Sequence, residues 1–322
     1  MEHHPRIYVA GRDTLVGSAI LRVLTSQGYD RLIQAPEPEV TDPVAVRRWF
    51  DQTAPTHVFI AAGKSGGIEA NQQHPAELMH QNLLVACHLV SAAYHTGVKK
   101  LLYLGSSCSY PRHCPQPMQE ESLLTGPLEP TSEAYAVAKI AGIKLCQSFR
   151  RQYGARFITG ILGDPFGPGD DFRPEHSHVI AALIRRLHEA KERAASTVTV
   201  WGTGAPRRGF TYVDDLASAC VFVMERYEEI EPINMASGWD CSIKDIALQI
   251  QEVVGYQGTI SFDPTKPDGM PVKVLDATRL LNLGWRPRWN LRSALQVTYE
   301  WYLETHRRLT QGHSTREANV TA

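Results

Sequence analysis

The sequence predicts an α/β fold in which a Rossmann-type doubly wound parallel sheet is joined to a smaller C-terminal α+β domain. Through the first half of the 322 residues, short apolar runs alternate with helical patterns. Such βαβ repetition gives a parallel sheet with helices on both faces. A turn with two glycines follows the first apolar run, at residues 11–17, and from about Gly167 a polar loop interrupts the alternation.

The elements of the first half follow one another in a regular order. Short apolar runs predict buried parallel strands; they are residues 6–10, 31–35, 57–62 and 100–104. Longer stretches with apolar residues at helical spacing predict the connecting helices; they are residues 16–24, 44–50, 77–94 and 135–153. We therefore assign residues 1–165 to a dinucleotide-binding domain.

The second half is predicted to hold the substrate-binding domain, residues 166–306. Its expected helices are residues 178–192, 243–254 and 291–303, and its expected short strands are 198–201, 233–234 and 260–262. Residues 307–322 are polar and lack a sustained apolar face, so we expect a mobile tail.

Composition excludes several classes of protein. The chain has 33 basic and 34 acidic residues, so its net charge of −1 offers no general attraction to nucleic acid or to an anionic membrane surface. No stretch approaches the roughly 20 apolar residues that a membrane span needs. The N-terminus lacks the pattern of a secretory signal, which favours a cytoplasmic location. Six scattered cysteines form neither a disulfide framework nor a metal-ligand pattern, so we expect reduced thiols and no metal site.

The first loop is a candidate for dinucleotide binding. Gly11 and Gly17 bracket a turn that follows a strand and opens a helix. In such a turn, backbone N–H groups approach a pyrophosphate at the positive end of the helix. Thr14 stands where the middle glycine is expected. A turn with two glycines also fits a purely packing role.

Tyr135 and Lys139 form a candidate proton-transfer pair. They lie four residues apart, so on a helix the phenol and the ammonium share one face. A nearby cation favours the phenolate, which makes the tyrosine a better proton shuttle. Taken alone, the pair also fits an ordinary exposed helix surface. Ser106 changes this balance because it follows a predicted strand, at the carboxyl edge where open α/β sheets bind ligands.

Six further segments are more specific than these generic signals: 61–68 (AAGKSGGI), 105–111 (GSSCSYP), 128–131 (LEPT), 138–146 (AKIAGIKLC), 177–180 (SHVI) and 266–269 (KPDG). Together they closely resemble the GDP-L-fucose synthase family of extended short-chain dehydrogenases/reductases. The similarity runs from about residue 6 to about residue 303. It implies a 3,5-epimerase-4-reductase that acts on GDP-4-keto-6-deoxy-D-mannose, uses NADP(H) with NAD(H) possible, and forms a homodimer.

The resemblance also implies roles for particular residues. Ser106, Tyr135 and Lys139 would be the reductase triad, and Cys108 and His178 the acid/base pair for epimerisation. The cofactor would contact Gly11, Arg12, Thr14, Leu15, Val16, Gly17, Leu104, Gly105, Ser106, Lys139, Leu162, Gly163, Asp164, Pro165 and His178. The GDP-sugar would contact Arg186, Trp201, Arg208, Asp268 and Lys273. A motif at 212–215, shared widely by extended dehydrogenases, implies that residues 211–235 return to the first domain.

The residue types suit this chemistry. A ketone at C4 acidifies the protons at C3 and C5, so epimerisation needs one group to remove a proton and another to return one. Without the resemblance, Cys108 would read as a packed strand-end thiol and His178 as a helix-start residue. Arg186 and Lys273 would likewise read as solvated surface.

Three positions depart from the family pattern. Thr14 replaces a loop glycine, residues 162–165 stand where the family usually shows Pro-Thr-Asn-Leu, and residues 34–37 (QAPE) end the second predicted strand where basic residues often meet a 2′-phosphate. These departures keep other functions open. One is a C5-only epimerase-reductase of the GDP-colitose type, or another nucleotide-sugar epimerase. A second is a non-catalytic, dinucleotide-binding regulatory subunit.

Overall fold

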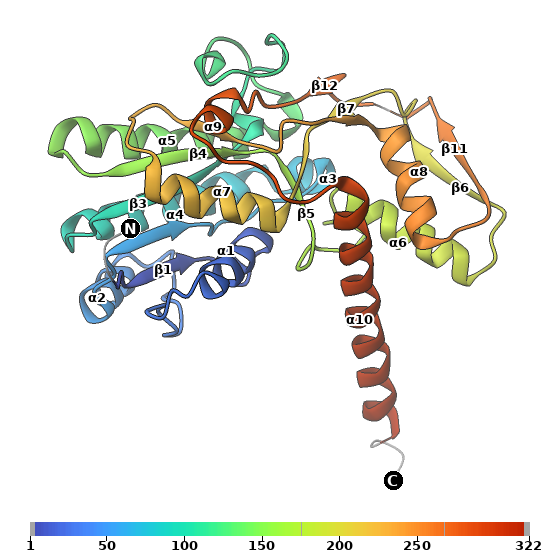
Figure 1. The fold of residues 1–322 in the computed structure, drawn as a ribbon, viewed down its shortest axis with the longest axis horizontal. Coiled ribbons are helices and arrows are strands. Elements are labelled where there is room, and N and C mark those ends of the chain that lie inside the picture. The colour runs from blue at the N-terminus through green and yellow to red at the C-terminus, as the bar shows by residue number, and fades with distance from the viewer. Residues whose placement is uncertain (1–3, 175, 267, 319–322) are drawn as a thin grey trace.

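A five-stranded parallel sheet forms the centre of the molecule (Figure 1). The structure is a computed structural model that describes residues 4–174, 176–266 and 268–318. The strands lie in the order β1-β2-β3-β4-β9 and every adjacent pair is parallel. Their bounds are β1 Ile7–Ala10, β2 His57–Ile60, β3 Lys100–Ser106, β4 Phe157–Leu162 and β9 Ile233–Met235.

Helices cover both faces of this sheet, as the alternation of apolar runs predicts. Successive strand residues point to opposite faces, so Tyr8 and Ala10 enter one core and Ile7 and Val9 the other. The first core lies under α2 Pro43–Thr53, α4 Pro75–His95 and α5 Glu133–Tyr153. The second lies under α1 Leu15–Ser26 and α7 Val213–Arg226. Helix α7 was not among the predicted elements.

The strand predicted at residues 31–35 is wrong. The segment makes a single parallel bridge, Ile7 to Leu32, beside β1. Its backbone then leaves the sheet, where Pro36 and Pro38 follow. A proline has no N–H to donate to a neighbouring strand, so the ladder does not continue through this segment.

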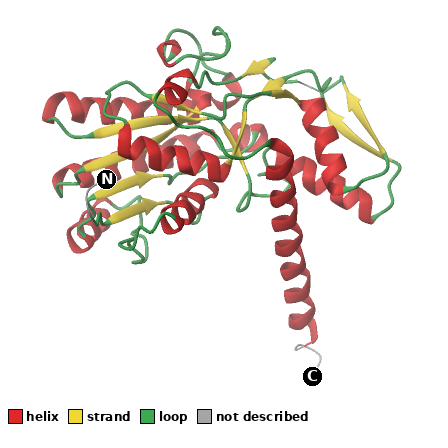
Figure 2. Ribbon diagram, in the orientation of Figure 1, coloured by secondary structure: helices red, strands yellow, loops and turns green. Residues whose placement is uncertain are grey.

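A second group of elements packs beside the sheet around its own core (Figure 2). Its helices include α6 Val179–Glu192, α8 Ile243–Val254 and α10 Leu291–Ala318. Its small sheets pair β6 Thr197–Trp201 with β11 Thr259–Asp263, and β7 Arg207–Arg208 with both β10 Cys241–Ser242 and β12 Val272–Lys273. Between the two groups, β5 Asp164–Phe166 pairs with β8 Phe210–Tyr212. Short helices complete the order: α3 Ile68–Gln73, η1 Ser107–Ser109, η2 Glu120–Ser122, η3 Pro130–Ser132 and α9 Thr278–Asn282.

Helix α10 continues to Ala318, well beyond the predicted end at residue 303, and it extends away from the body (Figure 1). The mobility of the tail stays a prediction, and residues 319–322 lie outside the described ranges. The division into domains at residues 165 and 166 also stays a prediction. Within the described residues, none of the helices combines the length and hydrophobicity of a membrane span.

An ion pair with a buried lysine lies at the amino end of β3. Lys100, the first residue of β3, is 2% exposed. Its Nζ donates to the Tyr227 carbonyl and to Glu228 Oε1, both at 2.7 Å. Arg156 Nη2 donates to the same Glu228 oxygen at 2.5 Å. Burial alone would raise the pKa of Glu228, but the hydrogen bonds from Arg156 and Lys100 lower it to about 2.

We predict that Glu228→Gln lowers the free energy of unfolding by about 2 kcal/mol near neutral pH. The buried ammonium loses its charged partner, although the exposed edge of the carboxylate reduces the effect. Because folding lowers the pKa of Glu228 from 4.5 to about 2, the contribution is present above that unfolded value and is lost as the pH falls through the folded one. Urea unfolding of Glu228→Gln and of the neighbouring control Glu229→Gln should show this. A gap between Glu228→Gln and the parent that does not shrink in acid would contradict it.

Candidate active site

The glycine loop opens α1 at the carboxyl end of β1. Gly11 has a φ of +79°, and a Cβ built on it would lie 2.6 Å from the Ala62 Cα. A Cβ on Gly17 would lie 2.0 Å from the Gly11 carbonyl oxygen. The backbone packing at both positions thus excludes side chains, as a close phosphate-binding turn requires.

Thr14 fits this loop although it replaces a glycine. It is the N-cap of α1: its Oγ1 accepts from the Gly17 N–H at 3.1 Å and donates to the Gly11 carbonyl at 2.8 Å. A capping threonine satisfies one of the free N–H groups of the first turn. Thr14 departs from the family pattern but stabilises the same turn, because its hydroxyl bonds both Gly11 and Gly17. Leu15 and Val16 begin the helix behind it.

Glu37, from the segment where basic residues often meet a 2′-phosphate, contacts the same loop through hydrogen bonds that the sequence did not predict. Glu37 Oε1 accepts from the backbone N–H of Gly11 at 3.0 Å and of Arg12 at 3.3 Å. Burial raises the pKa of Glu37, and these two hydrogen bonds oppose the shift. The Arg12 guanidinium turns away and donates to the carbonyls of Gln34 and Ala35.

Ser106, Tyr135 and Lys139 come together at the carboxyl end of β3. Ser106 ends that strand, and its hydroxyl hydrogen-bonds the Tyr135 phenol. Lys139 lies one turn further along α5, with its Nζ 5.8 Å from the centroid of the Tyr135 ring and donating to the Leu104 carbonyl at 3.1 Å. Gly142 permits this close approach of helix to strand, since a Cβ there would lie 2.2 Å from the Tyr103 ring.

Electrostatics distinguish the two members of the pair. Burial raises the pKa of Tyr135, the nearby Cys108 adds to the rise, and the hydrogen bond from Ser106 opposes it. Burial lowers the pKa of Lys139 to about 8. The phenol is therefore protonated at neutral pH and can give a proton to an oxygen held beside it.

Asn82 is a residue of this site that sequence reasoning missed. It is buried on α4, and its side-chain amide donates to the carbonyls of Lys64 and Leu78. A Cβ built on Gly63 would lie 2.3 Å from Asn82 Oδ1 and 3.8 Å from Lys139 Nζ. Asn82 thus links the loop after β2 to α4, at a point close to Lys139 on α5. Its signal in the sequence is one amide inside an otherwise apolar helix face.

Cys108 is part of a second cluster next to the triad. It lies in η1, and its N–H donates to Ser106 Oγ at 3.3 Å. Lys273 Nζ is 3.9 Å from Cys108 Sγ and 2.7 Å from Asp164 Oδ1. Ser107 Oγ donates to the same Asp164 oxygen at 3.4 Å.

His178 faces this cluster from the N-cap of α6. His178 is exposed, yet the surrounding protein removes enough water to lower the pKa of the imidazole. The charge of Asp164 opposes that shift, and the charge of Lys273 adds to it. The structure therefore brings both predicted acid/base residues to one cluster of charges.

The remaining cofactor candidates line the same edge. Leu104 and Gly105 precede Ser106 on β3, and Ser106 pairs in register with Leu162 on β4. Gly163, Asp164 and Pro165 continue from Leu162 into β5. The predicted cofactor residues thus lie at the carboxyl ends of β1, β3 and β4, apart from Lys139, which reaches this edge from α5, and His178, which approaches from α6.

Four of the five substrate candidates lie on α6, β6, β7 and the loop between β11 and β12. Trp201 is 64% exposed, with Lys266 Nζ 5.5 Å from its ring centroid. Asp268 accepts from the Thr203 backbone N–H at 2.7 Å, and Arg208 Nη1 donates to the Met270 carbonyl at 2.7 Å. Arg186 donates to the Thr199 carbonyl on β6. The fifth, Lys273, lies with Asp164 and Cys108 instead.

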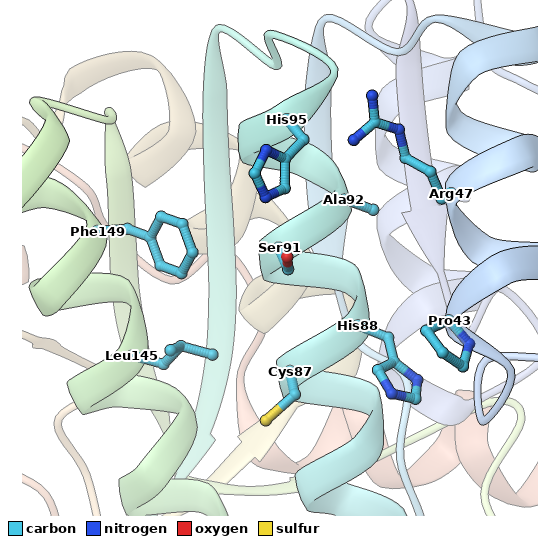
Figure 3. A pocket seen from close by; sticks show the side chains of 9 residues that line it. All are labelled: Pro43, Arg47, Cys87, His88, Ser91, Ala92, His95, Leu145 and Phe149. Carbon is cyan, nitrogen blue, oxygen red and sulfur yellow. The ribbon is translucent and has the colours of Figure 1, made fainter.

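A distinct pocket opens on the outer face of α2, α4 and α5 (Figure 3). Its lining includes Cys87, His88, His95, Leu145 and Phe149, which are not among the predicted site residues. Within the part of the chain that the structure describes, no group of three or more histidine, cysteine or acidic side chains is arranged to hold a metal ion.

Comparison with known proteins agrees with this geometry. Residues 7–236 match the NAD dependent epimerase/dehydratase family. GDP-L-fucose synthase 1 of Arabidopsis thaliana is 49% identical over 301 residues, covering 93% of each chain. The GDP-L-fucose synthase of Escherichia coli K12 is 46% identical, covering 94% of this chain and 98% of its own. A GDP-L-colitose synthase of Yersinia pseudotuberculosis is 33% identical, covering 92% and 98%.

A solved structure gives the same result for the fold. A GDP-L-fucose synthetase from Naegleria fowleri, bound to NADP, superposes with a TM-score of 0.88 at 26% identity and covers 95% of both chains. Matches of this length and identity establish that the chain belongs to the NAD dependent epimerase/dehydratase family, together with the GDP-L-fucose synthases.

Proposed function

We propose that the protein is an NADP(H)-dependent epimerase-reductase that converts GDP-4-keto-6-deoxy-D-mannose to GDP-L-fucose. The observation that carries this proposal is the adjacency of two kinds of chemistry. A Ser106–Tyr135–Lys139 reductase triad lies beside Cys108, which has its own charged neighbours, and His178. The names of the Arabidopsis thaliana and Escherichia coli relatives support GDP-L-fucose as the product.

Reduction uses the triad. The glycine loop fits a dinucleotide because Gly11 and Gly17 let the turn pack closely at the N-terminus of α1, where backbone N–H groups can face a pyrophosphate. A bound NADPH would supply hydride to C4. Ser106 and Tyr135 hold the C4 oxygen between two hydroxyls, and Tyr135 gives that oxygen its proton. Lys139 orients the phenol and stabilises the phenolate that remains.

Epimerisation uses Cys108 and His178 on the same ketosugar. One removes a proton from the carbon beside the ketone, and the C–H electron pair becomes part of an enolate. The other returns a proton to the opposite face, and the ketone re-forms. Ser106 and Tyr135 hold the enolate oxygen, as donors in such sites do.

The C5-only alternative shares these residues, and product stereochemistry separates it from epimerisation at both carbons. A non-catalytic dinucleotide-binding subunit would have no chemical need for Cys108, His178 and the triad together. The GDP-colitose relative is also the more distant one. We therefore favour the fucose-forming reaction.

The assembly that we propose is a homodimer in the cytoplasm. Helices α4 and α5 pack against each other, and their outer face carries apolar residues that the sheet does not cover. Tyr94 and Tyr153 stack there with centroids 4.6 Å apart, and Val137 is 37% exposed. The pocket in Figure 3 lies on this side of the molecule. Pairing these helices with a second copy would bury that surface.

The two half-reactions should separate by mutation. With GDP-4-keto-6-deoxy-D-mannose in D₂O, Tyr135→Phe should slow cofactor oxidation at least about a hundredfold because no proton reaches the C4 oxygen. It should still incorporate deuterium at C3 and C5, at a reduced rate, because Ser106 still holds the enolate oxygen. Cys108→Ala and His178→Ala should instead lose deuterium incorporation, read by NMR of the recovered sugar.

Matched controls for this experiment are Cys114→Ala, a half-buried thiol, and His176→Ala, two residues before His178. Both should behave as the parent enzyme. Parental deuterium exchange in both Cys108→Ala and His178→Ala would refute the acid/base assignment. No turnover of this substrate by the parent enzyme would refute the proposed reaction itself.

Cofactor choice should depend on Glu37. A carboxylate on the loop N–H groups repels the 2′-phosphate of NADPH, so we expect NADPH to be used with a preference over NADH below about a thousandfold. Glu37→Gln should raise the NADPH to NADH ratio of kcat/KM about tenfold, which corresponds to about 1.4 kcal/mol. The control is Glu39→Gln, since Glu39 is exposed and hydrogen-bonds Thr41. An unchanged ratio in Glu37→Gln would contradict this role.

The proposed dimer should appear in sedimentation at micromolar concentration as a species of twice the 35.9 kDa chain mass. Val137→Glu should shift it to the monomer, because a charge would be buried in the interface. Leu248→Glu on α8 is the control, since Leu248 is similarly exposed at 42% but lies away from α4 and α5. A parent chain that sediments as a monomer would rule out this interface.

A further inference from the structure

The ion pair between Asp164 and Lys273 has a third participant. Lys273 Nζ is 2.7 Å from Asp164 Oδ1 and 3.9 Å from Cys108 Sγ. The three residues come from different elements: Asp164 begins β5, Cys108 lies in η1, and Lys273 ends β12. Strand β12 reaches this place because Lys273 pairs in register with Arg208 on β7.

Both partners are charged at neutral pH. Burial alone would raise the pKa of Asp164, but the nearby ammonium of Lys273 more than offsets it and holds the pKa below its usual range. Burial alone would lower the pKa of Lys273, but Asp164 and then Cys108 raise it. The Lys273 side chain is only 16% exposed. An ion pair withdrawn from water contributes little net stability, so a functional reason for it is expected.

The functional reason that we consider is the reactivity of the neighbouring Cys108 sulfur. If Cys108 removes a proton from the sugar, it must begin as a thiolate. If it delivers one, the S–H bond breaks as the new C–H bond forms, the enolate supplies the electron pair, and the thiolate remains. In either direction an ammonium beside the sulfur stabilises the anionic form.

The alternative for Lys273 is the one that the sequence implied, contact with the GDP part of the substrate. Lys273 Nζ is held by Asp164 and lies beside Cys108 Sγ, so its ammonium faces the predicted acid/base cluster rather than the group of Arg186, Trp201 and Asp268. Arg208 is the better candidate for a diphosphate, because its guanidinium donates to the backbone carbonyls of Arg207 and Met270. Asp164 itself stands where the family pattern has an uncharged asparagine.

We propose that Lys273 is a positioning residue for Cys108: Asp164 holds its ammonium against the sulfur, where it stabilises the thiolate during epimerisation. This inference rests on the proposed function, because it presumes that Cys108 moves a proton. It assigns to the Asp164–Lys273 pair a role in the proton-transfer step rather than in nucleotide binding.

The test measures alkylation of the thiol in the full chain without substrate. Iodoacetamide labelling near pH 7.5, read by peptide mass spectrometry, gives separate rates for Cys108 and for the half-buried Cys114, which lies outside the proposed dimer face. Lys273→Met should slow labelling of Cys108 at least about tenfold and leave the rate at Cys114 unchanged. Lys273→Arg keeps the charge and should restore the Cys108 rate to within about threefold of the parent. The control Lys266→Met should leave both rates unchanged.

Substrate measurements complete the test. Lys273→Met should lower the rate of deuterium incorporation about tenfold, with little change in KM or in the Kd for GDP. Unchanged labelling of Cys108, or slower labelling that Lys273→Arg does not restore, would overturn the proposal. So would a tenfold rise in the Kd for GDP with parental labelling, which is the result of a diphosphate contact. Because the labelling needs no substrate, it remains decisive even if the parent enzyme fails to turn over the GDP-ketosugar.

Discussion

Parallel pairing of the central strands is the constraint on which the rest of this structure depends. Because neighbouring strands run in the same direction, their carboxyl ends meet at one edge, and β1, β3 and β4 deliver the glycine loop, Ser106 and Asp164 there. Helix α5 must then lie close against β3 for Tyr135 and Lys139 to reach Ser106. The missing side chain of Gly142 makes that distance possible, since the Tyr103 ring fills its place.

The parts that could be predicted from the sequence are those set by local rules. Apolar runs such as 57–62 locate buried strands, and a strand-end serine with a helical Tyr-x-x-x-Lys pair predicts neighbours because sheet direction and helix period fix where each points. The strand predicted at 31–35 fails because two prolines follow it. The carboxylate of Glu37 and the position of Lys273 depend on how a loop and a two-residue strand fold back over the sheet, which neither periodicity nor motif spacing encodes.

Two lysines show how differently one kind of ion pair can be used. Lys100 at the amino end of β3 bonds a carbonyl and Glu228, with Arg156 sharing the carboxylate, so its donors are engaged by groups that join neighbouring elements. Lys273 belongs to β12 but lies near the carboxyl end of β3, where it bonds one carboxylate and places its charge beside a thiol. The first arrangement links the amino end of β3 to the segment that follows α7. The second places charge beside a group that can gain and lose a proton.

The single bridge between Ile7 and Leu32 has a consequence for solubility. Strand β1 lies at the outer edge of the five-stranded sheet, and an exposed edge of this kind can recruit a strand from another molecule and lead to aggregation. Here residues 31–33 cover part of that edge: the Ile7 N–H donates to the Arg31 carbonyl, and the Ile7 carbonyl accepts from the Ile33 N–H. Pro36 and Pro38 then end the cover with backbone positions that have no N–H to offer. The two prolines that end this segment as a strand therefore also disfavour its pairing with a strand of a neighbouring molecule.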